Sequence, residues 1–174
     1  EIIGSESRSF HAYVHIPFCT VKCGYCDFNT YTSSELGTLK QSDFAATLVG
    51  EIGLSANILK QSDVSSRKLK TVFFGGGTPS LLPAADLISI LNSLETEFGF
   101  EDDAEITFEA NPDSVTKDSL ASLRDAGFNR ISIGMQSAVT DVLKTLERTH
   151  NPENVAIALD IAKSLGYRTS LDLI

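Results

Sequence analysis

The chain has 174 residues, of which 42% are hydrophobic, and its formal net charge at pH 7 is -9. This length suits one globular domain whose core needs no disulfides, and the composition excludes a largely disordered protein. The acidic balance argues against nucleic acid as a partner, and no apolar run approaches the roughly 20 residues that span a bilayer.

Strands and amphipathic helices are predicted to alternate from the N-terminus onward. We expect residues 1–10 to be a flexible segment and residues 11–174 to form one domain. The first half predicts a strand over 12–16, a helix over about 38–60, a strand over 70–74 and a helix that starts at Pro83. The apolar positions that give these two helices a buried face are Leu39, Phe44, Leu48, Ile52 and Leu59, followed by Leu87, Ile90, Leu91 and Leu94.

The second half continues the same alternation. Strands are predicted over 105–109, 131–133 and 169–174, and helices over 116–125, 139–146 and 151–165. Gly127 and Gly166 can end two of these helices, and Asn151 followed by Pro152 can begin the last one.

Five strands separated by helices predict a mainly parallel sheet with helices on its outside. We expect barrel-like curvature because polar and glycine residues recur at the carboxyl ends of the strands, where sites are built in such folds. These residues are Cys19, the run 75–78, Glu109, Gln136 and Asp172. The chain stops inside the fifth strand with no closing helix, so we expect a truncated barrel.

All three cysteines fall within eight residues, at Cys19, Cys23 and Cys26. Their Cys-x3-Cys-x2-Cys spacing can turn three thiolates toward one inorganic group, and no fourth cysteine completes the set. On a cuboidal 4Fe–4S cluster, one iron would stay open to a chelating ligand. We expect a cytoplasmic protein because the N-terminus has no leader pattern, and that location would keep the thiols reduced.

Two other uses of the cysteines are open. A disulfide framework would leave one cysteine unpaired in every arrangement. A zinc site could add a histidine, and His11, His15 and His150 are available, although zinc loops usually pair two Cys-x2-Cys knuckles. On its apolar strand, His15 is better explained as a packed, hydrogen-bonded residue than as a ligand. The cluster is therefore the preferred interpretation.

Five distinctive stretches follow one another along the chain. Tyr-Val-His-Ile-Pro-Phe-Cys starts at Tyr13, Phe-Phe-Gly-Gly-Gly-Thr-Pro-Ser at Phe73, Glu-Ala-Asn-Pro at Glu109, Asn-Arg-Ile-Ser-Ile-Gly-Met-Gln-Ser at Asn129, and Leu-Asp-Leu-Ile at Leu171. With the cysteine motif, they resemble the radical S-adenosylmethionine superfamily. Within it they are similar to the group that contains oxygen-independent coproporphyrinogen III oxidase and the heme chaperones.

The resemblance implies a partial (β/α) barrel in which the three cysteines hold three irons of a 4Fe–4S cluster. It further implies that the amino and carboxylate groups of S-adenosylmethionine chelate the fourth iron. An electron donor would reduce the cluster, and one electron would then cleave the ligand to methionine and a 5′-deoxyadenosyl radical.

By matched position, the resemblance also implies a set of S-adenosylmethionine contacts. Glycines without Cβ atoms can approach the ligand closely and point N–H groups at its carboxylate. Glu109 can accept from its ammonium or ribose, Arg148 can face its carboxylate, and Gln136 or Asp172 can hold ribose hydroxyls. The full set is Tyr13, Tyr25, Gly76, Gly77, Thr78, Glu109, Gln136, Arg148 and Asp172.

Phe28, two residues after the third cysteine, separates the two members of the group. The oxidase has a fourth cysteine there, whereas phenylalanine resembles the heme chaperones. The resemblance therefore favours a protein that binds heme and delivers it to apo-haemoproteins such as respiratory enzymes. An enzyme that acts on coproporphyrinogen III or another tetrapyrrole remains the alternative. The family's C-terminal domain is absent from this sequence, so we expect no turnover from the chain by itself.

Overall fold

The structure is a computed structural model that describes residues 8–32, 35, 40–62, 64 and 67–174. Its sheet has the strand order β1-β2-β3-β4-β5, and every neighbouring pair is parallel. The strands are β1 (Phe10–Ile16), β2 (Leu69–Gly76), β3 (Phe100–Ala110), β4 (Arg130–Gln136) and β5 (Arg168–Leu173).

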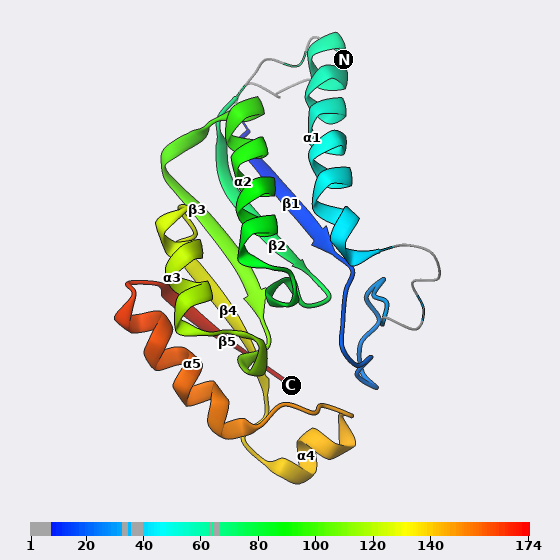
Figure 1. Cartoon of the computed structure of the whole chain (residues 1–174), viewed down its shortest axis with the longest axis vertical. Coiled ribbons are helices and arrows are strands. Elements are labelled where there is room, and N and C mark those ends of the chain that lie inside the picture. Colours follow the sequence, from blue (N-terminus) through cyan, green and yellow to red (C-terminus); the bar gives the residue numbers. More distant parts are fainter. Residues whose placement is uncertain (1–7, 33–34, 36–39, 63, 65–66) are drawn as a thin grey trace.

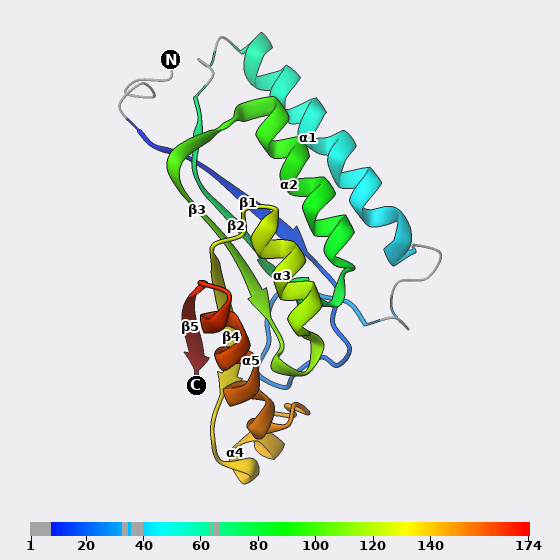
Figure 2. The ribbon, with the colours of Figure 1, turned by 60° about the vertical axis from the view of Figure 1, so that its left-hand side comes forward.

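The helices are α1 (Phe44–Gln61), α2 (Ala84–Phe98), α3 (Lys117–Asp125), α4 (Thr140–Thr145) and α5 (Pro152–Ser164). Of these, α1, α2, α3 and α5 form a row along one face of the sheet (Figure 1). Turned by 60°, the sheet is seen to curve away from this row, and none of the described helices covers its other face (Figure 2). The fold is thus the expected parallel sheet with outer helices, curved as a partial barrel and open between β1 and β5.

The hydrophobic core fills the space between the sheet and the helix row. Alternate strand residues point into it, and they meet the apolar faces of α2, α3 and α5. Phe128 lies at its centre, with its ring 5.1 Å from that of Phe74 and 5.5 Å from that of Phe108, measured between centroids. All three rings are fully buried, so aromatic packing ties the loop before β4 to β2 and β3.

The other face of the sheet is polar, which the sequence analysis did not foresee. Glu105 on β3 lies between two arginines, 3.7 Å from Arg130 and 3.4 Å from Arg168. Arg130 also donates to Ser170 at 2.9 Å. These partners sit on three neighbouring strands, so a hydrogen-bonded layer lines the concave side below the carboxyl ends.

Element boundaries differ most from expectation in two places. Helix α1 begins at Phe44, after a 3-10 turn over Gln41–Asp43, whereas the pattern predicted a start near Thr38; residues 38 and 39 lie outside the described part. Strand β3 begins at Phe100, five residues before the expected start. Gly99, with φ 71°, turns the chain directly from α2 into β3.

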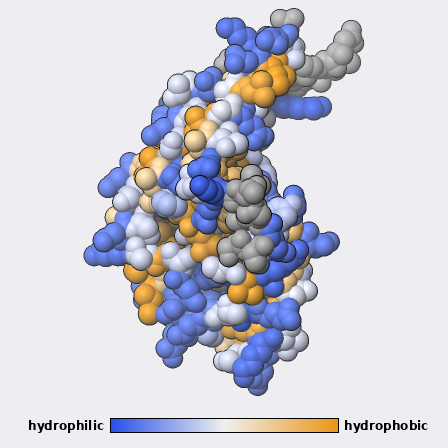
Figure 3. All heavy atoms as spheres, turned by 45° about the vertical axis from the view of Figure 1, so that its right-hand side comes forward, coloured by the Kyte–Doolittle hydropathy of each residue, from blue (hydrophilic) through white to orange (hydrophobic). Residues whose placement is uncertain are grey.

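The expected flexible segment over residues 1–10 falls mainly outside the described residues. Residues 1–7 are not described, and Phe10 is the first residue of β1. Among the described residues, no helix combines the length and apolar character that a membrane span requires. On the face drawn in Figure 3, hydrophobic residues form small groups among hydrophilic ones.

Candidate functional site

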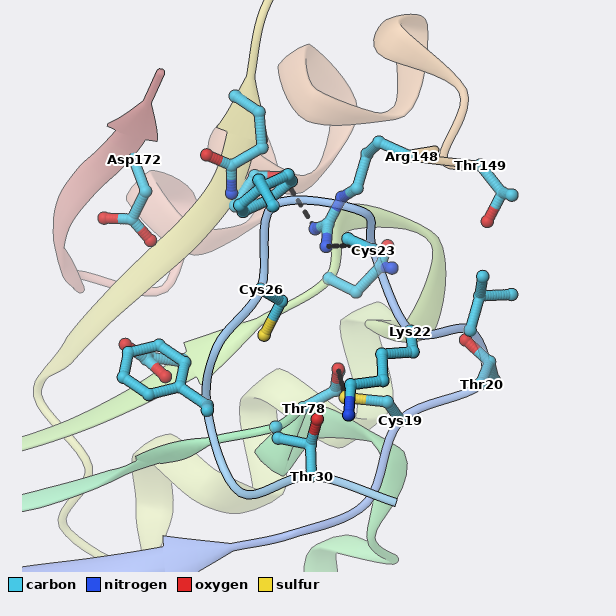
Figure 4. A pocket seen from close by; sticks show the side chains of 18 of the residues that line it. Cys19, Thr20, Lys22, Cys23, Cys26, Thr30, Thr78, Arg148, Thr149 and Asp172 are labelled. Atoms are coloured by element: carbon cyan, nitrogen blue, oxygen red, sulfur yellow. Dashed lines mark hydrogen bonds between the residues drawn. The ribbon is translucent and has the colours of Figure 1, made fainter. Parts of the chain in front are cut away.

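The carboxyl ends of the strands surround a cavity of about 320 Å³. Its walls come from the cysteine loop (residues 17–31), the loop after β2, the ends of β3, β4 and β5, and the segment after α4 (Figure 4). All predicted site residues except Tyr13 line it: Cys19, Cys23, Cys26, Tyr25, Gly76, Gly77, Thr78, Glu109, Gln136, Arg148 and Asp172.

Tyr13 lies beside the cavity, on the concave face of β1. Its hydroxyl is 3.2 Å from His15 Nδ1, and its ring is stacked with that of Phe73 at 6.2 Å between centroids. Burial and the nearby charge of Glu109 raise the pKa of Tyr13. Its side chain is nevertheless 59% exposed, so it remains accessible next to the site.

Backbone hydrogen bonds and one buried ring hold the cysteine loop in place. The Cys19 N–H donates to the Tyr31 carbonyl at 3.0 Å, and the Tyr31 N–H donates to Pro17 at 2.7 Å. Phe18 is buried and packs edge-on against Phe44 of α1, 5.0 Å away between centroids. The loop is therefore anchored at both ends before any ligand binds.

The residues that follow β2, Gly77 and Thr78, support the cysteine loop through backbone hydrogen bonds. The Gly77 N–H donates to Ile16 O at 2.7 Å, and the Thr78 N–H donates to Phe18 O at 2.8 Å. A Cβ on Gly77 would lie 2.6 Å from the Phe18 oxygen. Glycine is thus required for close approach, but the approach is to the protein's own backbone. The glycine N–H groups were expected to face the ligand's carboxylate, but that of Gly77 is engaged by Ile16 and that of Gly76 by Glu109.

The sulfur atoms face polar groups across the cavity. Cys19 Sγ lies 3.8 Å from Thr78 Oγ1, and Arg148 Nη1 donates toward Cys23 Sγ at 3.8 Å (Figure 4). Burial raises the pKa of the Cys19 thiol, whereas the hydroxyls of Thr78 and Thr30 oppose that shift. Thr30 is 3% exposed, and apart from the nearby Cys19 sulfur its Oγ1 has no hydrogen-bond partner among the described residues. A buried hydroxyl without a further partner suits a wall that a bound group completes.

The donor set suits an iron–sulfur cluster better than a single ion. All three cysteines are free thiols and partly exposed. Within the described ranges, no three His, Cys, Asp or Glu side chains converge closely enough to hold one metal ion. A cuboidal cluster distributes its thiolates over separate irons and does not need them to meet at one point.

Glu109 lies near the end of β3, the middle strand of the sheet, and lines the cavity. Its Oε2 accepts from the Gly76 N–H at 3.1 Å. Burial raises the pKa of the Glu109 carboxyl, Asp172 raises it further, and the Gly76 hydrogen bond and His15 oppose the shift. A partly desolvated carboxylate in this position can accept hydrogen bonds from a cationic or hydroxyl-bearing ligand.

Asp172 is oriented by a chain of hydroxyls that sequence reasoning missed. Ser132 donates to Asp172 Oδ1 at 2.9 Å, and Ser132 Oγ lies 2.8 Å from Ser170 Oγ. Ser170 accepts in turn from Arg130. Because Ser132 is 4% exposed, one carboxylate oxygen of Asp172 is fixed against the sheet.

Arg148 reaches the cavity from the segment after α4. Its Nη2 donates to Gly134 O at 3.0 Å, and its Nε donates to His150 Nδ1 at 3.1 Å. A Cβ on Gly134 would lie 2.7 Å from Nη2, so a side chain there would displace the guanidinium from this position. Tyr25 lies near the same charge, and burial raises its pKa to about 12, with Arg148 opposing.

The histidines have structural partners. As expected, His15 is hydrogen-bonded: its Nε2 lies 2.9 Å from Asn29 O, and Tyr13 contacts its Nδ1. His11 lies 2.7 Å from Thr71 Oγ1. His150 contacts Arg148 instead of a cysteine. These positions give no support to a zinc site built from the cysteines and a histidine.

A sequence model of the radical SAM superfamily matches residues 13–174 of the chain. "Heme chaperone HemW" of Mycobacterium tuberculosis is 41% identical over 168 residues, which are 96% of this chain and 42% of that protein. The protein of the same name in Escherichia coli is 39% identical, over 92% of this chain and 41% of its own length.

A solved structure supports the same grouping. The radical SAM enzyme coproporphyrinogen III oxidase (HemN) of Escherichia coli superimposes with a TM-score of 0.80 at 32% identity. The match covers 95% of this chain and 37% of that one. The chain therefore spans about two fifths of the length of the proteins that it matches.

Proposed function

The chain belongs to the radical SAM superfamily, and we propose that this protein is a heme chaperone that carries a 4Fe–4S cluster and S-adenosylmethionine. The observation that carries the proposal is the joint placement of three free cysteines and the matched polar residues around one cavity. The heme chaperones that share 39–41% identity with the chain supply the second argument.

Cys19, Cys23 and Cys26 would hold three irons of the cluster and leave the fourth open. When bound, the reduced cluster supplies one electron to the sulfonium of S-adenosylmethionine. The protein's contribution is to orient and shield these groups. Phe18 and Tyr31 fix the loop that bears the cysteines, and the Cys23 sulfur receives a hydrogen bond from Arg148.

The cavity walls would orient S-adenosylmethionine by complementary charge. Arg148 would face the ligand's carboxylate, and Glu109 would accept from its ammonium group. Asp172, fixed by Ser132, would accept from a ribose hydroxyl with its second oxygen. Gln136, Tyr25, Tyr13, Thr78 and the carbonyls of Gly76 and Gly77 complete the proposed set.

Heme would be the cargo, and an apo-haemoprotein in the cytoplasm would be the acceptor, with a separate electron donor for the cluster. The second candidate is an enzyme that acts on coproporphyrinogen III or a related tetrapyrrole. The observation in its favour is the TM-score of 0.80 with HemN. The chain has Phe28 where the oxidase group has a further cysteine, which favours the chaperone.

The test is a heme titration of the anaerobically reconstituted chain, followed by mixing with an apo-cytochrome. We expect a Soret band that saturates and then shifts as the acceptor takes up heme. The matched control is the Cys23→Ser variant, and the Mycobacterium tuberculosis relative is the positive control.

Two results would go against the chaperone. Heme binding by the relative but not by the chain, under the same conditions, would contradict the proposal for this chain. Consumption of a tetrapyrrole substrate together with steady formation of 5′-deoxyadenosine would favour the enzyme.

A further inference from the structure

The guanidinium of Arg148 is held at three points by groups from three parts of the fold. Nη2 donates to the carbonyl of Gly134 on β4, Nη1 donates toward Cys23 Sγ, and Nε donates to His150 Nδ1. A guanidinium has five N–H donors, so one hydrogen on each terminal nitrogen is left for a ligand. Arg148 can therefore touch a cluster thiolate and a ligand carboxylate together.

His150 is the buried member of this group. It is 4% exposed, and because its Nδ1 accepts from Arg148, the ring must be neutral with its proton on Nε2. Nε2 is buried and has no hydrogen-bond partner within the described part of the chain. Burial and the charge of Arg148 both lower the pKa of His150, and only Asp113 opposes them. The environment thus favours the acceptor form that Arg148 requires.

The backbone around His150 is fixed on both sides. Before it, Glu147 has φ 54°, and the carbonyl of Leu146 accepts from the Gly24 N–H of the cysteine loop at 3.3 Å. After it, Asn151 caps α5, and its N–H donates to the carboxylate of Asp113 at 3.3 Å. The backbone contacts therefore hold the His150 imidazole in place, and the imidazole can position the longer, more flexible side chain of Arg148.

The residues before Arg148, Leu146 and Glu147, also pack closely against the cysteine loop. A Cβ on Gly24 would lie 2.7 Å from Glu147 Oε2, so the side chain of Glu147 occupies the space that any larger residue at position 24 would need. With the Gly24–Leu146 hydrogen bond, this contact joins the loop between Cys23 and Cys26 to Leu146 and Glu147, which precede Arg148 and His150 in the chain.

We propose that His150 is a positioning residue: its Nδ1 holds the Arg148 guanidinium between Cys23 and the cavity and so orders the cofactor site. Neither the family resemblance nor the comparisons assign it a role. This inference rests on the proposed function for its effect on ligand binding. The hydrogen bond itself is independent of any cofactor.

The first test uses the cofactor-free chain. In ¹⁵N NMR spectra of the His150 ring at neutral pH, we expect an unprotonated Nδ1 and a protonated Nε2. The Arg148 Nε–H should exchange slowly with solvent. A His150 ring with its proton on Nδ1 would overturn the proposal, whatever the chain binds.

The second test measures the dissociation constant for S-adenosylmethionine on the reconstituted chain. His150→Leu removes the acceptor, and we expect about tenfold weaker binding, the effect of one lost hydrogen bond to a charged group. His150→Asn keeps an acceptor near the place of Nδ1 and should restore most of the affinity. His11→Leu, on the concave face away from Arg148, is the control and should change nothing.

The outcomes separate this inference from the proposed function. Equal weakening by His150→Leu and His150→Asn would contradict the hydrogen-bond role. Unchanged binding in a folded His150→Leu would do so as well. If the wild-type chain binds no S-adenosylmethionine, the proposed function fails, while the NMR measurement still decides the Arg148–His150 interaction.

Discussion

Burial of a polar side chain at the cavity costs hydration free energy, and the hydrogen bonds that the side chain makes within the protein offset only part of this cost. Glu109 illustrates this because burial is the largest influence on its pKa and raises it. Among the described residues, the hydrogen bond that it accepts comes from the Gly76 N–H. A carboxylate kept in this state destabilises the empty protein and is suited to a ligand that can donate to it.

Replacing Glu109 with glutamine should therefore stabilise the cofactor-free chain at neutral pH. The folded carboxyl holds its proton more tightly than the unfolded one, whose ordinary pKa is 4.5, so wild-type stability falls as pH rises from there through the raised folded value. Glutamine cannot ionise, yet it keeps an acceptor for the Gly76 N–H. Urea unfolding should show Glu109→Gln to be more stable than wild type at about pH 8 and nearly equal at about pH 4. A variant that is less stable by the same amount at both pH values would refute the argument.

Several residue-level contacts had no signal in the sequence. Ser132 and Asp172 are brought together by the parallel register of β4 and β5, and His150 and Arg148 by the turn after α4. Nothing local distinguishes these residues from ordinary surface or core positions. His150 was considered only as a possible zinc ligand. The cysteines, in contrast, are recognisable because their spacing itself carries the chemistry.

At the scale of elements, the periodicity of the hydrophobic residues and the positions of turn residues predicted all five strands and the helices between them. The predictions were weakest where tertiary pairing extends an element. Strand β3 includes Glu101 and Asp102, which have no strand pattern, because its first residue Phe100 pairs with Leu69 of β2. The glycine run was expected to approach a ligand, but the tightest contact of Gly77 is with Phe18 of the cysteine loop.

That contact predicts a clear difference between two glycine substitutions. In Gly77→Ala, the new Cβ would lie 2.6 Å from Phe18 O and 2.9 Å from Ile16 O, and backbone atoms cannot move away cheaply. We expect a loss of about 1–3 kcal/mol in the free energy of unfolding. Gly50→Ala, on the exposed side of α1 with no atom within 4 Å, should gain about 0.5–1 kcal/mol. Thermal and urea unfolding of both variants would check this, and equal effects would contradict the packing argument.

At the scale of the whole molecule, the two faces of the sheet have different roles, one in stability and the other in the site. The helix side supplies the stability through a continuous apolar core. The concave side and the carboxyl rim carry almost all the polar groups that the site requires. Polar residues at the ends of successive strands predicted the rim, because carboxyl ends of parallel strands must share an edge, whereas the polar concave face below the rim was not predicted.

The central claim is that the three cysteines hold a cluster with one open iron, and anaerobic reconstitution with iron and sulfide tests it most directly. We expect about four irons and four sulfides per chain, and an EPR spectrum of the reduced protein that changes when S-adenosylmethionine is added. Replacing any one of the three cysteines with serine should abolish both results. Binding of zinc without labile sulfide, or a spectrum indifferent to S-adenosylmethionine, would contradict the account.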